Sequence, residues 1–394
     1  MNPDQMTAMS EALALTRAGR VAEATAVIQR ALAGHRTGSA SAPAPATHNG
    51  SVPGEVLWSD DGPGDRTSPH HYPRGGLRDL LRQGLAPAAA GATTSAPPTH
   101  LPGLPTLPHD GPRTPMPALP GRTSTHTHRG AAGERPYTVY VPTTGTGPRP
   151  LVVMLHGGTQ TGADFAVATR MSELAEQHGF LVAYPEQVTS ANGMRCWNWF
   201  VPDDQRRGGG EPAIIAGIVS EIAAAHDVDP DRVYVAGFSA GAAMAAVVGA
   251  AYPDVFAAVG VHSGLPHGCA HDVASGVAAM RRPAAVRPLR RAVPVIAFHG
   301  DADPTVAAGN AAGVVEQFTG GPVRGDTLVE RGPGHPATRV VVRRDGAVRG
   351  ELWTVHGSGH AWSGGVAGGS YTDPAGPDAS AEMVRFFGEH PRRG

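Results

Sequence analysis

The chain has 394 residues, with 32 basic and 34 acidic side chains and a formal net charge of -2. This balance gives no reason to expect nucleic acid or an anionic membrane surface as a partner. No apolar run approaches the roughly 20 residues of a membrane span. The N-terminus has no basic stretch followed by an apolar run. It therefore does not resemble a secretory signal, which favours a cytoplasmic location.

Residues 1–35 are predicted to form a helical hairpin. Their alanine-rich, amphipathic spacing is interrupted at Gly19, which is typical of two short helices. A single hairpin cannot bury its own apolar face. We therefore expect it to dock on the rest of this chain or on a partner, or to fray.

Residues 36–134 are predicted to be a mostly disordered linker. They are rich in Pro, Gly, Ser, Thr and Ala and poor in large aliphatic residues. Such a segment buries too little apolar surface to offset the entropy of ordering it. One island at 71–85 has a short helical pattern. The Thr-His-Thr-His run at 125–128 is interpreted as solvated linker rather than as a metal site.

Residues 135–394 have the pattern of a single α/β domain. Strand-like runs alternate with helix-like runs, which predicts a mostly parallel sheet with helices on both faces. Apolar runs that do not alternate with polar residues indicate strands buried on both faces. The predicted strands are 136–142, 150–158, 180–186, 232–239, 256–264 and 293–303, with two more around the Asp345-Gly346 turn, and the predicted helices are 163–179, 211–228, 240–253, 307–318 and 379–390.

The segment Gly-Phe-Ser-Ala-Gly at 237–241 lies where a predicted strand gives way to a predicted helix. This context is typical of a nucleophile elbow, in which Ser239 would sit on a sharp turn above the C-terminal edge of the sheet. The motif also arises by chance in glycine-rich chains. The flanking strand and helix are what favour the catalytic interpretation.

A serine nucleophile needs a base to take its proton, and in this topology an acid and then a histidine should follow it along the chain. Asp303, after a predicted strand, is the favoured acid, with Asp301 as the alternative. His360, beyond a Gly-Ser-Gly turn, is the favoured base, with His356 as the alternative. For either aspartate, a turn-capping role is the competing interpretation.

Two backbone amides are predicted to hold the oxyanion. One is that of Ala240, at the start of the helix after the serine. The other is expected in the loop at 156–160, where the amide of Thr159 is favoured over those of Gly158 and Gln160. This chemistry is two-step acyl transfer, and it requires no metal or organic cofactor.

Four residues are candidate substrate contacts: Trp362, Trp197, Trp199 and Gln160. The tryptophans fall in segments near the predicted site and could form apolar walls for an acyl chain, although core packing is the commoner use of tryptophan. The stretch 265–292 is too short for a large lid, although it could form a small flap. We therefore expect an open cleft, which suits a chain-like or bulky ester.

Seven segments resemble, in order, the poly(3-hydroxybutyrate) depolymerase family of esterases: HGGTQTGADFA, RCWNWF, GEPAIIAGIV, VYVAGFSAGAAMA, VGVHSGLPHG, HGDADPTV and GSGHAWSGG. The resemblance covers about residues 130–390. It implies an α/β-hydrolase fold with Ser239 as nucleophile, Asp303 as acid and His360 as base. It also leaves an extracellular location open.

The resemblance implies an ester or polyester as substrate, with poly(3-hydroxybutyrate) or its oligomers favoured. Because the family has relatives among feruloyl and acetylxylan esterases, an esterase of that type is the alternative. A second alternative is a non-catalytic granule-binding or scaffold protein on the same fold, since fold does not fix function.

The two cysteines, Cys196 and Cys269, match no zinc or Cys-x-x-Cys spacing. Two thiols alone leave a single disulfide and two buried thiols both open. Many members of the family have a cysteine where this chain has Gly158. The resemblance therefore implies that Cys196 lacks its usual partner.

Overall fold

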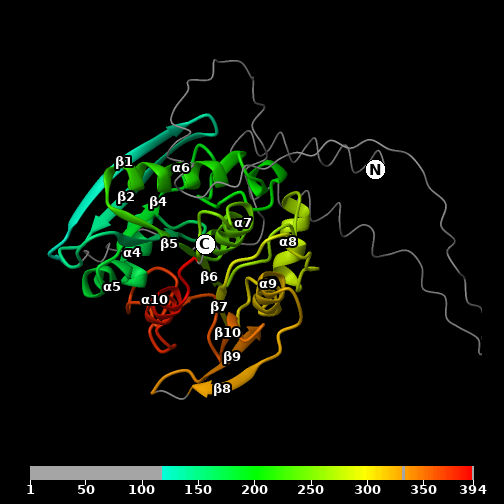
Figure 1. Ribbon diagram of the computed structural model, residues 1–394. Helices are drawn as coiled ribbons and strands as arrows, with labels where there is room; N and C mark the ends of the chain where they lie inside the picture. Colours follow the sequence, from blue (N-terminus) through cyan, green and yellow to red (C-terminus); the bar gives the residue numbers. More distant parts are fainter. Residues whose placement is uncertain (1–117, 331–332, 393–394) are drawn as a thin grey trace, which may run out of the picture. The chain divides into compact units, whose positions relative to one another are not determined.

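The computed structural model describes residues 118–330 and 333–392, and the predictions for 1–35 and 71–85 lie outside these residues. Figure 1 shows the main sheet of the described part, in the order β1-β2-β4-β3-β5-β6-β7-β10-β9-β8. Its strands are β1 Arg122–Gly130, β2 Gly133–Val141, β3 Arg149–Leu155, β4 Leu181–Pro185, β5 Val228–Phe238, β6 Ala258–His262, β7 Val295–Gly300, β8 Asp326–Glu330, β9 Ala337–Arg344 and β10 Ala347–Val355. The helices are α4 Gly162–Thr169, α5 Met171–His178, α6 Gly210–Ala225, α7 Ala240–Ala251, α8 Val273–Arg281, α9 Gly309–Thr319 and α10 Ala379–Glu389, with a short 3-10 helix η1 at Pro202–Gln205.

The centre of the sheet is parallel and its edges are antiparallel. Strands β4, β3, β5, β6, β7 and β10 pair in parallel. Strands β1 and β2 extend one edge and β9 and β8 the other, all in antiparallel pairing. Because parallel strands share one C-terminal edge, the loops that follow β5, β7 and β10 meet there. A separate short pair, β11 Trp362–Ser363 and β12 Thr372–Asp373, lies in the loop region after β10.

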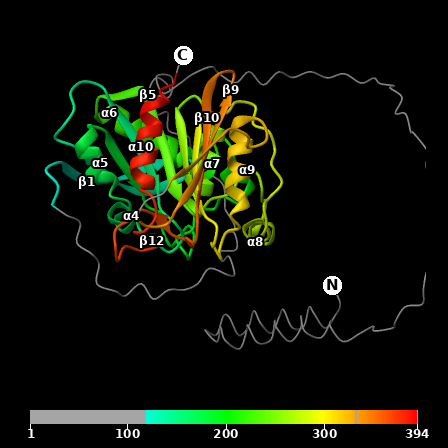
Figure 2. The same ribbon diagram turned by 90° about the horizontal axis from the view of Figure 1, so that it is seen from below.

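Helices cover both faces of the sheet, as the sequence pattern predicts (Figure 2). Along β3, Leu151, Val153 and Leu155 belong to a core shared with α6, α7 and α9. The residues between them, Val152 and Met154, belong to a second core shared with α4, α5 and α10. Both sides of each central strand are thus apolar, which explains why these runs do not alternate. Among the described helices, none is long and apolar enough to cross a bilayer.

The sheet begins earlier than the boundary predicted at residue 135. Strand β1 lies within the segment interpreted as linker, and it pairs with β2 along its whole length, from Arg122↔Val141 to Gly130↔Gly133. Most of its side chains are exposed, so ladder hydrogen bonds hold it rather than burial of large aliphatics. The Thr-His-Thr-His run is therefore part of an edge strand, in which only His128 is buried, with its ring 2.8 Å from Glu221 on α6.

The helix predicted at 163–179 is two helices. Arg170 lies between α4 and α5 with φ of 53°, in the left-handed region. Its guanidinium donates to Asp378 Oδ2 at 2.8 Å, beside α10. This tertiary contact and the left-handed backbone break a run whose residue types would allow a continuous helix.

The stretch 265–292 contains α8, which the sequence analysis did not predict. The side chain of Asn310 on α9 donates to the carbonyl of Ala279 at 2.9 Å and accepts from the amide of Ala284 at 3.1 Å. These bonds dock α8 beside α9, and the helix is nine residues long. Within 265–292 this nine-residue helix agrees with the expectation that the stretch is too short for a large lid.

Both cysteines are free thiols, Cys196 buried and Cys269 half-buried. Burial raises the pKa of both, that of Cys269 to about 12. Both side chains are therefore protonated and unreactive at neutral pH.

Candidate active site

Ser239 lies on the turn between β5 and α7. Its backbone has φ of 52° and ψ of -116°, a conformation that a residue with a side chain rarely adopts. The Ser239 amide donates to the carbonyl of His262 at 2.9 Å, which ties the turn to the neighbouring strand β6. The turn places the hydroxyl at the C-terminal edge of the sheet, with the first amides of α7 beside it.

Two glycines make this turn possible. A Cβ on Gly237 would lie 2.4 Å from the carbonyl carbon of Gly241. A Cβ on Gly241 would lie 2.1 Å from the carbonyl oxygen of Leu155 on β3. Both contacts are with backbone atoms, which cannot move aside as a flexible side chain can. Glycine is required at these positions by space rather than by a positive φ.

The structure brings Ser239, His360 and Asp303 together. The Nε2 atom of His360 lies 2.9 Å from Ser239 Oγ. The Nδ1 atom of the same ring lies 2.7 Å from Asp303 Oδ2. A carboxylate can only accept, so Nδ1 carries the proton and Nε2 presents a lone pair to the hydroxyl. Ser239 is only 6% exposed, so the three residues lie in a largely enclosed site that reaches solvent on one side.

Asp303 is held as a buried carboxylate. Its Oδ1 accepts from the amides of Thr305 and Val306 at 2.8 and 2.9 Å. Its Oδ2 accepts from His360 and, at 3.1 Å, from Nε2 of His299. Burial raises the pKa of this carboxyl, but the hydrogen bonds from His299 and His360 together outweigh that effect and hold the pKa well below its usual range.

His299 is a part of the site that the sequence analysis missed. It lies near the end of β7, with its side chain 1% exposed. Its Nε2 is also 3.0 Å from the carbonyl of Val306. The spacing of His299 and Asp303, four residues apart across a tight loop, is the feature of the sequence that could have indicated the contact.

The alternative acid and base pair with each other instead. Asp301 Oδ2 lies 2.8 Å from Nδ1 of His356, and Asp301 Oδ1 accepts from the amide of Gly357 at 2.7 Å. Both side chains are about two-fifths exposed. Their recorded side-chain hydrogen bonds go to each other, to Gly357 and to Thr338 rather than to Ser239, so they form a surface pair.

The structure gives the amide of Thr159 a partner of its own. This amide donates to the carbonyl of Met194 at 2.7 Å. Thr159 has φ of 68°, in the left-handed region, and its N–H is taken up by the bond to Met194. The expectation that Thr159 donates to an oxyanion is therefore corrected.

Gly158 replaces it as the candidate donor. In the same loop, the amide of Gly157 donates to the side-chain oxygen of Gln160 at 2.9 Å, and the Gln160 amide lies 3.3 Å from the Gly157 carbonyl. Within residues 118–330 and 333–392, the structure records no partner for the amides of Gly158 and Ala240. Gly158 also lines the same cavity as Ser239.

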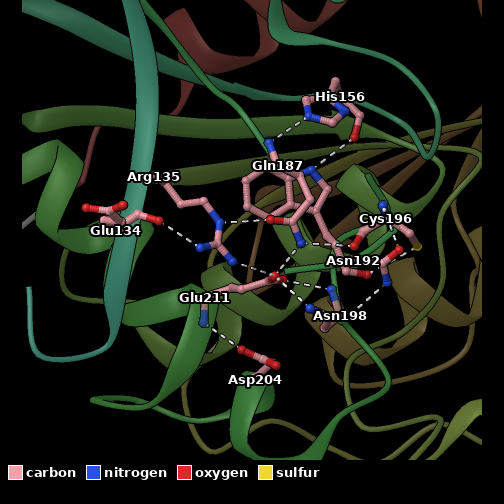
Figure 3. Close-up of polar contacts among 10 residues, drawn as sticks. Glu134, Arg135, His156, Gln187, Asn192, Cys196, Asn198, Asp204 and Glu211 are labelled. Carbon is pink, nitrogen blue, oxygen red and sulfur yellow. Dashed lines mark hydrogen bonds and ion pairs between the residues drawn. The ribbon is translucent and has the colours of Figure 1, made fainter. Parts of the chain in front are cut away.

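The loop at 156–160 is braced by a neutral histidine (Figure 3). His156 is fully buried, and burial lowers its pKa to about 4. Its Nδ1 donates to the carbonyl of Gly157 at 2.7 Å, and its Nε2 accepts from the amide of Gln187 at 3.0 Å. Only the neutral ring with its proton on Nδ1 satisfies both bonds.

A cavity of about 440 Å³ opens beside the serine. Its walls are largely apolar. Two of the lining residues are joined by a hydrogen bond, in which the Tyr371 hydroxyl lies 3.1 Å from Thr159 Oγ1. The lining residues are Gly158, Thr159, Phe238, Ser239, Ala302, Pro304, Thr305, Gly357, Gly359, His360 and Tyr371.

The four predicted substrate contacts lie outside this lining. Trp197, Trp199 and Trp362 are 0%, 3% and 1% exposed, so the competing interpretation, core packing, describes them. The Trp362 indole stacks on the ring of His262 and donates to the hydroxyl of Ser380. Gln160 is also buried, and its side chain holds the loop, accepting from Gly157 and donating to the carbonyl of Ser370 at 3.0 Å.

Phe238 and Tyr371 take the place expected of the tryptophans. Phe238 is the residue before Ser239, and its ring lies 4.9 Å from that of His360. Its position in the elbow motif could have indicated that it lines the cavity. Tyr371 lies beyond β11 with φ of 53°, and nothing in the local sequence distinguishes it from a surface loop residue.

The parallel sheet, the elbow after β5 and the helices on both faces define an α/β-hydrolase fold. Residues 135–331, half of the chain, match the family described as Esterase PHB depolymerase. The chain belongs to this family.

Relatives of known name agree with this placement. The chain is 44% identical over 184 residues to poly(3-hydroxyalkanoate) depolymerase C of Paucimonas lemoignei, covering 43% of this chain and 44% of that protein. It is 36% identical over 142 residues to feruloyl esterase B of Neurospora crassa, covering 36% of this chain and 47% of that protein. It therefore spans less than half the length of these relatives.

A solved structure supports the fold alone. The acetyl xylan esterase from Aspergillus awamori superimposes with a TM-score of 0.53 at 22% identity. The match covers 67% of this chain and 99% of that one.

Proposed function

We propose that the chain is a carboxylic ester hydrolase in which Ser239 is the nucleophile, His360 the general base and Asp303 the residue that orients the base. The observation that carries this proposal is the continuous pair of hydrogen bonds, 2.9 Å from Ser239 to His360 and 2.7 Å from His360 to Asp303. Membership of an esterase family supports it.

The reaction follows from this geometry. His360 Nε2 takes the proton of Ser239 as Oγ attacks the ester carbonyl carbon. The resulting oxyanion accepts hydrogen bonds from the amides of Ala240 and Gly158, and each such donor is worth on the order of 3 kcal/mol. Asp303 keeps the proton of the ring on Nδ1 and stabilises the imidazolium. His360 then protonates the leaving alcohol, and the acyl-enzyme is hydrolysed by a water that His360 activates.

For the substrate we propose a poly(3-hydroxybutyrate)-type polyester or its oligomers. The rings of Phe238, Pro304 and Tyr371 wall the cavity and suit the short aliphatic units of such a chain. The similarity to poly(3-hydroxyalkanoate) depolymerase C points the same way. A feruloyl or acetylxylan ester is the competing substrate, supported by the relatives of those names.

A side-by-side hydrolysis assay tests both parts. Purified protein is offered short p-nitrophenyl esters, amorphous poly(3-hydroxybutyrate) and methyl ferulate, with Ser239→Ala as the control. We expect 3-hydroxybutyrate oligomers from the wild type and no hydrolysis by the variant. Release of ferulate alone would keep the triad and discard the polyester. A wild-type protein that neither hydrolyses esters nor labels with a fluorophosphonate would instead support the non-catalytic alternative.

A further inference from the structure

The oxyanion loop at 156–160 rests on the segment 186–200, which contains no helix or strand. Three hydrogen bonds join the two. Thr159 donates its amide to Met194, Gln187 donates its amide to His156, and the indole of Trp197 donates to the carbonyl of His156 at 3.1 Å. The position of the loop relative to Ser239 therefore depends on how firmly this irregular segment is held.

The segment is held by one buried carboxylate, that of Glu211 (Figure 3). Its Oε2 accepts from the amide of Asn198 at 2.7 Å. Its Oε1 accepts from the Asn198 side chain at 2.9 Å and from the side-chain amide of Gln187. These bonds hold the segment near both of its ends, at Gln187 and at Asn198.

Two short routes lead from Glu211 to the loop. Through Gln187, the backbone amide bonds to His156. Through Asn198, the side-chain oxygen accepts from Asn192 at 2.9 Å, and Asn192 in turn accepts from the amide of Met194 at 3.0 Å. The Met194 carbonyl is the acceptor that fixes Thr159. Each step from one residue to the next along these routes is a hydrogen bond.

The site of Glu211 suits an ionised carboxylate. It lies in the first turn of α6, where the helix dipole favours negative charge. It is 2% exposed, and Arg135 lies 3.3 Å away. The groups that face its oxygens are hydrogen-bond donors. The proton of a neutral carboxyl would therefore point at another donor instead of an acceptor. Burial and the neighbouring Asp204 raise its pKa, while Arg135 and the hydrogen bonds from Asn198 and Gln187 lower it.

We propose that Glu211 is a positioning residue for the oxyanion hole, acting through Asn198, Asn192 and Gln187 to hold the loop that carries the Gly158 amide. The proposal rests on the proposed esterase function. Glu211 is not among the residues that line the cavity, and its recorded hydrogen bonds go to Arg135, Gln187, Asn198 and Asp204 rather than to any lining residue. Its contribution is to the geometry of the transition state rather than to substrate binding.

The test is Glu211→Gln in the full-length chain. The amide keeps the volume of the side chain but sets a donor against the donors of Asn198 and Arg135. Because a displacement of about 1 Å in an active site can cost about 100-fold in rate, we expect kcat to fall by about 10- to 100-fold with KM changed less than about twofold. Affinity for a boronic acid transition-state analogue should fall in parallel.

Glu221→Gln is the matched control. Glu221 lies on the same helix and accepts from Tyr137 at 3.0 Å and pairs with His128 at 2.8 Å. These partners lead to β1 and β2 rather than to the loop. Its variant should lower thermal stability without lowering kcat. This comparison separates positioning from general destabilisation, provided that rates are measured well below the melting temperatures.

Asn192→Ser keeps the proposal testable if Glu211→Gln fails to fold. It breaks the route through Met194, together with the 3.4 Å bond from the Cys196 amide to Asn192, and leaves the route through Gln187 in place. It should lower kcat in the same direction. A folded Glu211→Gln or, failing that, a folded Asn192→Ser with wild-type kcat and wild-type boronic acid affinity would overturn the proposal. Undiminished activity of Ser239→Ala would instead overturn the proposed function, so the two failures are distinguishable.

Discussion

At the scale of single residues, two aspartates in the loop after β7 have opposite environments. The side chain of Asp303 is fully buried and accepts from the rings of His299 and His360. The side chain of Asp301 is 42% exposed and pairs with His356 at the surface. Residue type and loop are the same, so the direction of each side chain is what distinguishes them.

This difference predicts unequal effects of the same substitution. Asp303→Asn removes the charge that stabilises the imidazolium and favours the wrong tautomer of His360. We expect kcat to fall by about 10³- to 10⁴-fold. Asp301→Asn, the matched control, should leave kcat within about twofold of wild type. Steady-state hydrolysis of a p-nitrophenyl ester measures both, and equal losses would contradict the assignment of the acid.

The cavity walls predict a change in binding rather than in chemistry. Tyr371→Ala removes an aromatic wall and should raise KM for a butyrate ester by about tenfold, because a side-chain contact worth about 1.4 kcal/mol is lost. Tyr371→Phe keeps the ring and removes only the contact with Thr159, so its KM should change less. A raised KM in Trp199→Phe with none in Tyr371→Ala would restore the tryptophan hypothesis.

That Ser239, Asp303 and His360 lie together could be predicted from the sequence, because each follows a strand of the sheet in a fixed order. The walls could not be predicted in the same way. Tryptophan is used in a core as readily as in a pocket, and Tyr371 comes from an irregular loop. The amide of Thr159 shows a further limit, because its direction is set by a backbone angle of 68° that no residue type encodes.

At the scale of elements, the turn between β5 and α7 brings the backbone of Gly241 close to β3. Gly241→Ala would place a Cβ 2.1 Å from the carbonyl oxygen of Leu155. We expect the free energy of unfolding to fall by on the order of 3 kcal/mol, because backbone must move to relieve the overlap. Urea denaturation monitored by circular dichroism measures this.

Gly388→Ala is the control for that prediction. Gly388 lies in α10, and a Cβ there would meet nothing within 4 Å. Alanine should therefore stabilise the helix by about 0.5–1 kcal/mol. Similar destabilisation by both substitutions would show that glycine flexibility, rather than space at the elbow, is what matters.

The central elements could be predicted because burial on both faces gives them continuous apolar runs. The edges could not. Strand β1 is polar because its side chains meet solvent, so composition made it resemble the linker before it. The break between α4 and α5 depends on the contact of Arg170 with Asp378, which lies 208 residues away along the chain.

At the scale of the whole molecule, the fold keeps His156 neutral at the start of the loop 156–160. Its pKa falls from an ordinary value of 6.5 to about 4, chiefly because of burial. Between these values the unfolded chain binds the proton that the native state rejects. The contribution of His156 to stability is thus fully present above pH 6.5 and is lost as the pH falls below it.

A comparison of wild type with His156→Gln isolates this contribution, because other titrating groups, including Glu211 and His262, are common to both proteins. The shift corresponds to about 3 kcal/mol. We expect the difference between their free energies of unfolding to shift by about that amount, to the disadvantage of wild type, as the pH falls from about 7 to about 4. Urea unfolding at several pH values measures the difference. Parallel curves would mean that the ring is not held neutral, and the tautomer assigned to the brace of the oxyanion loop would then be wrong.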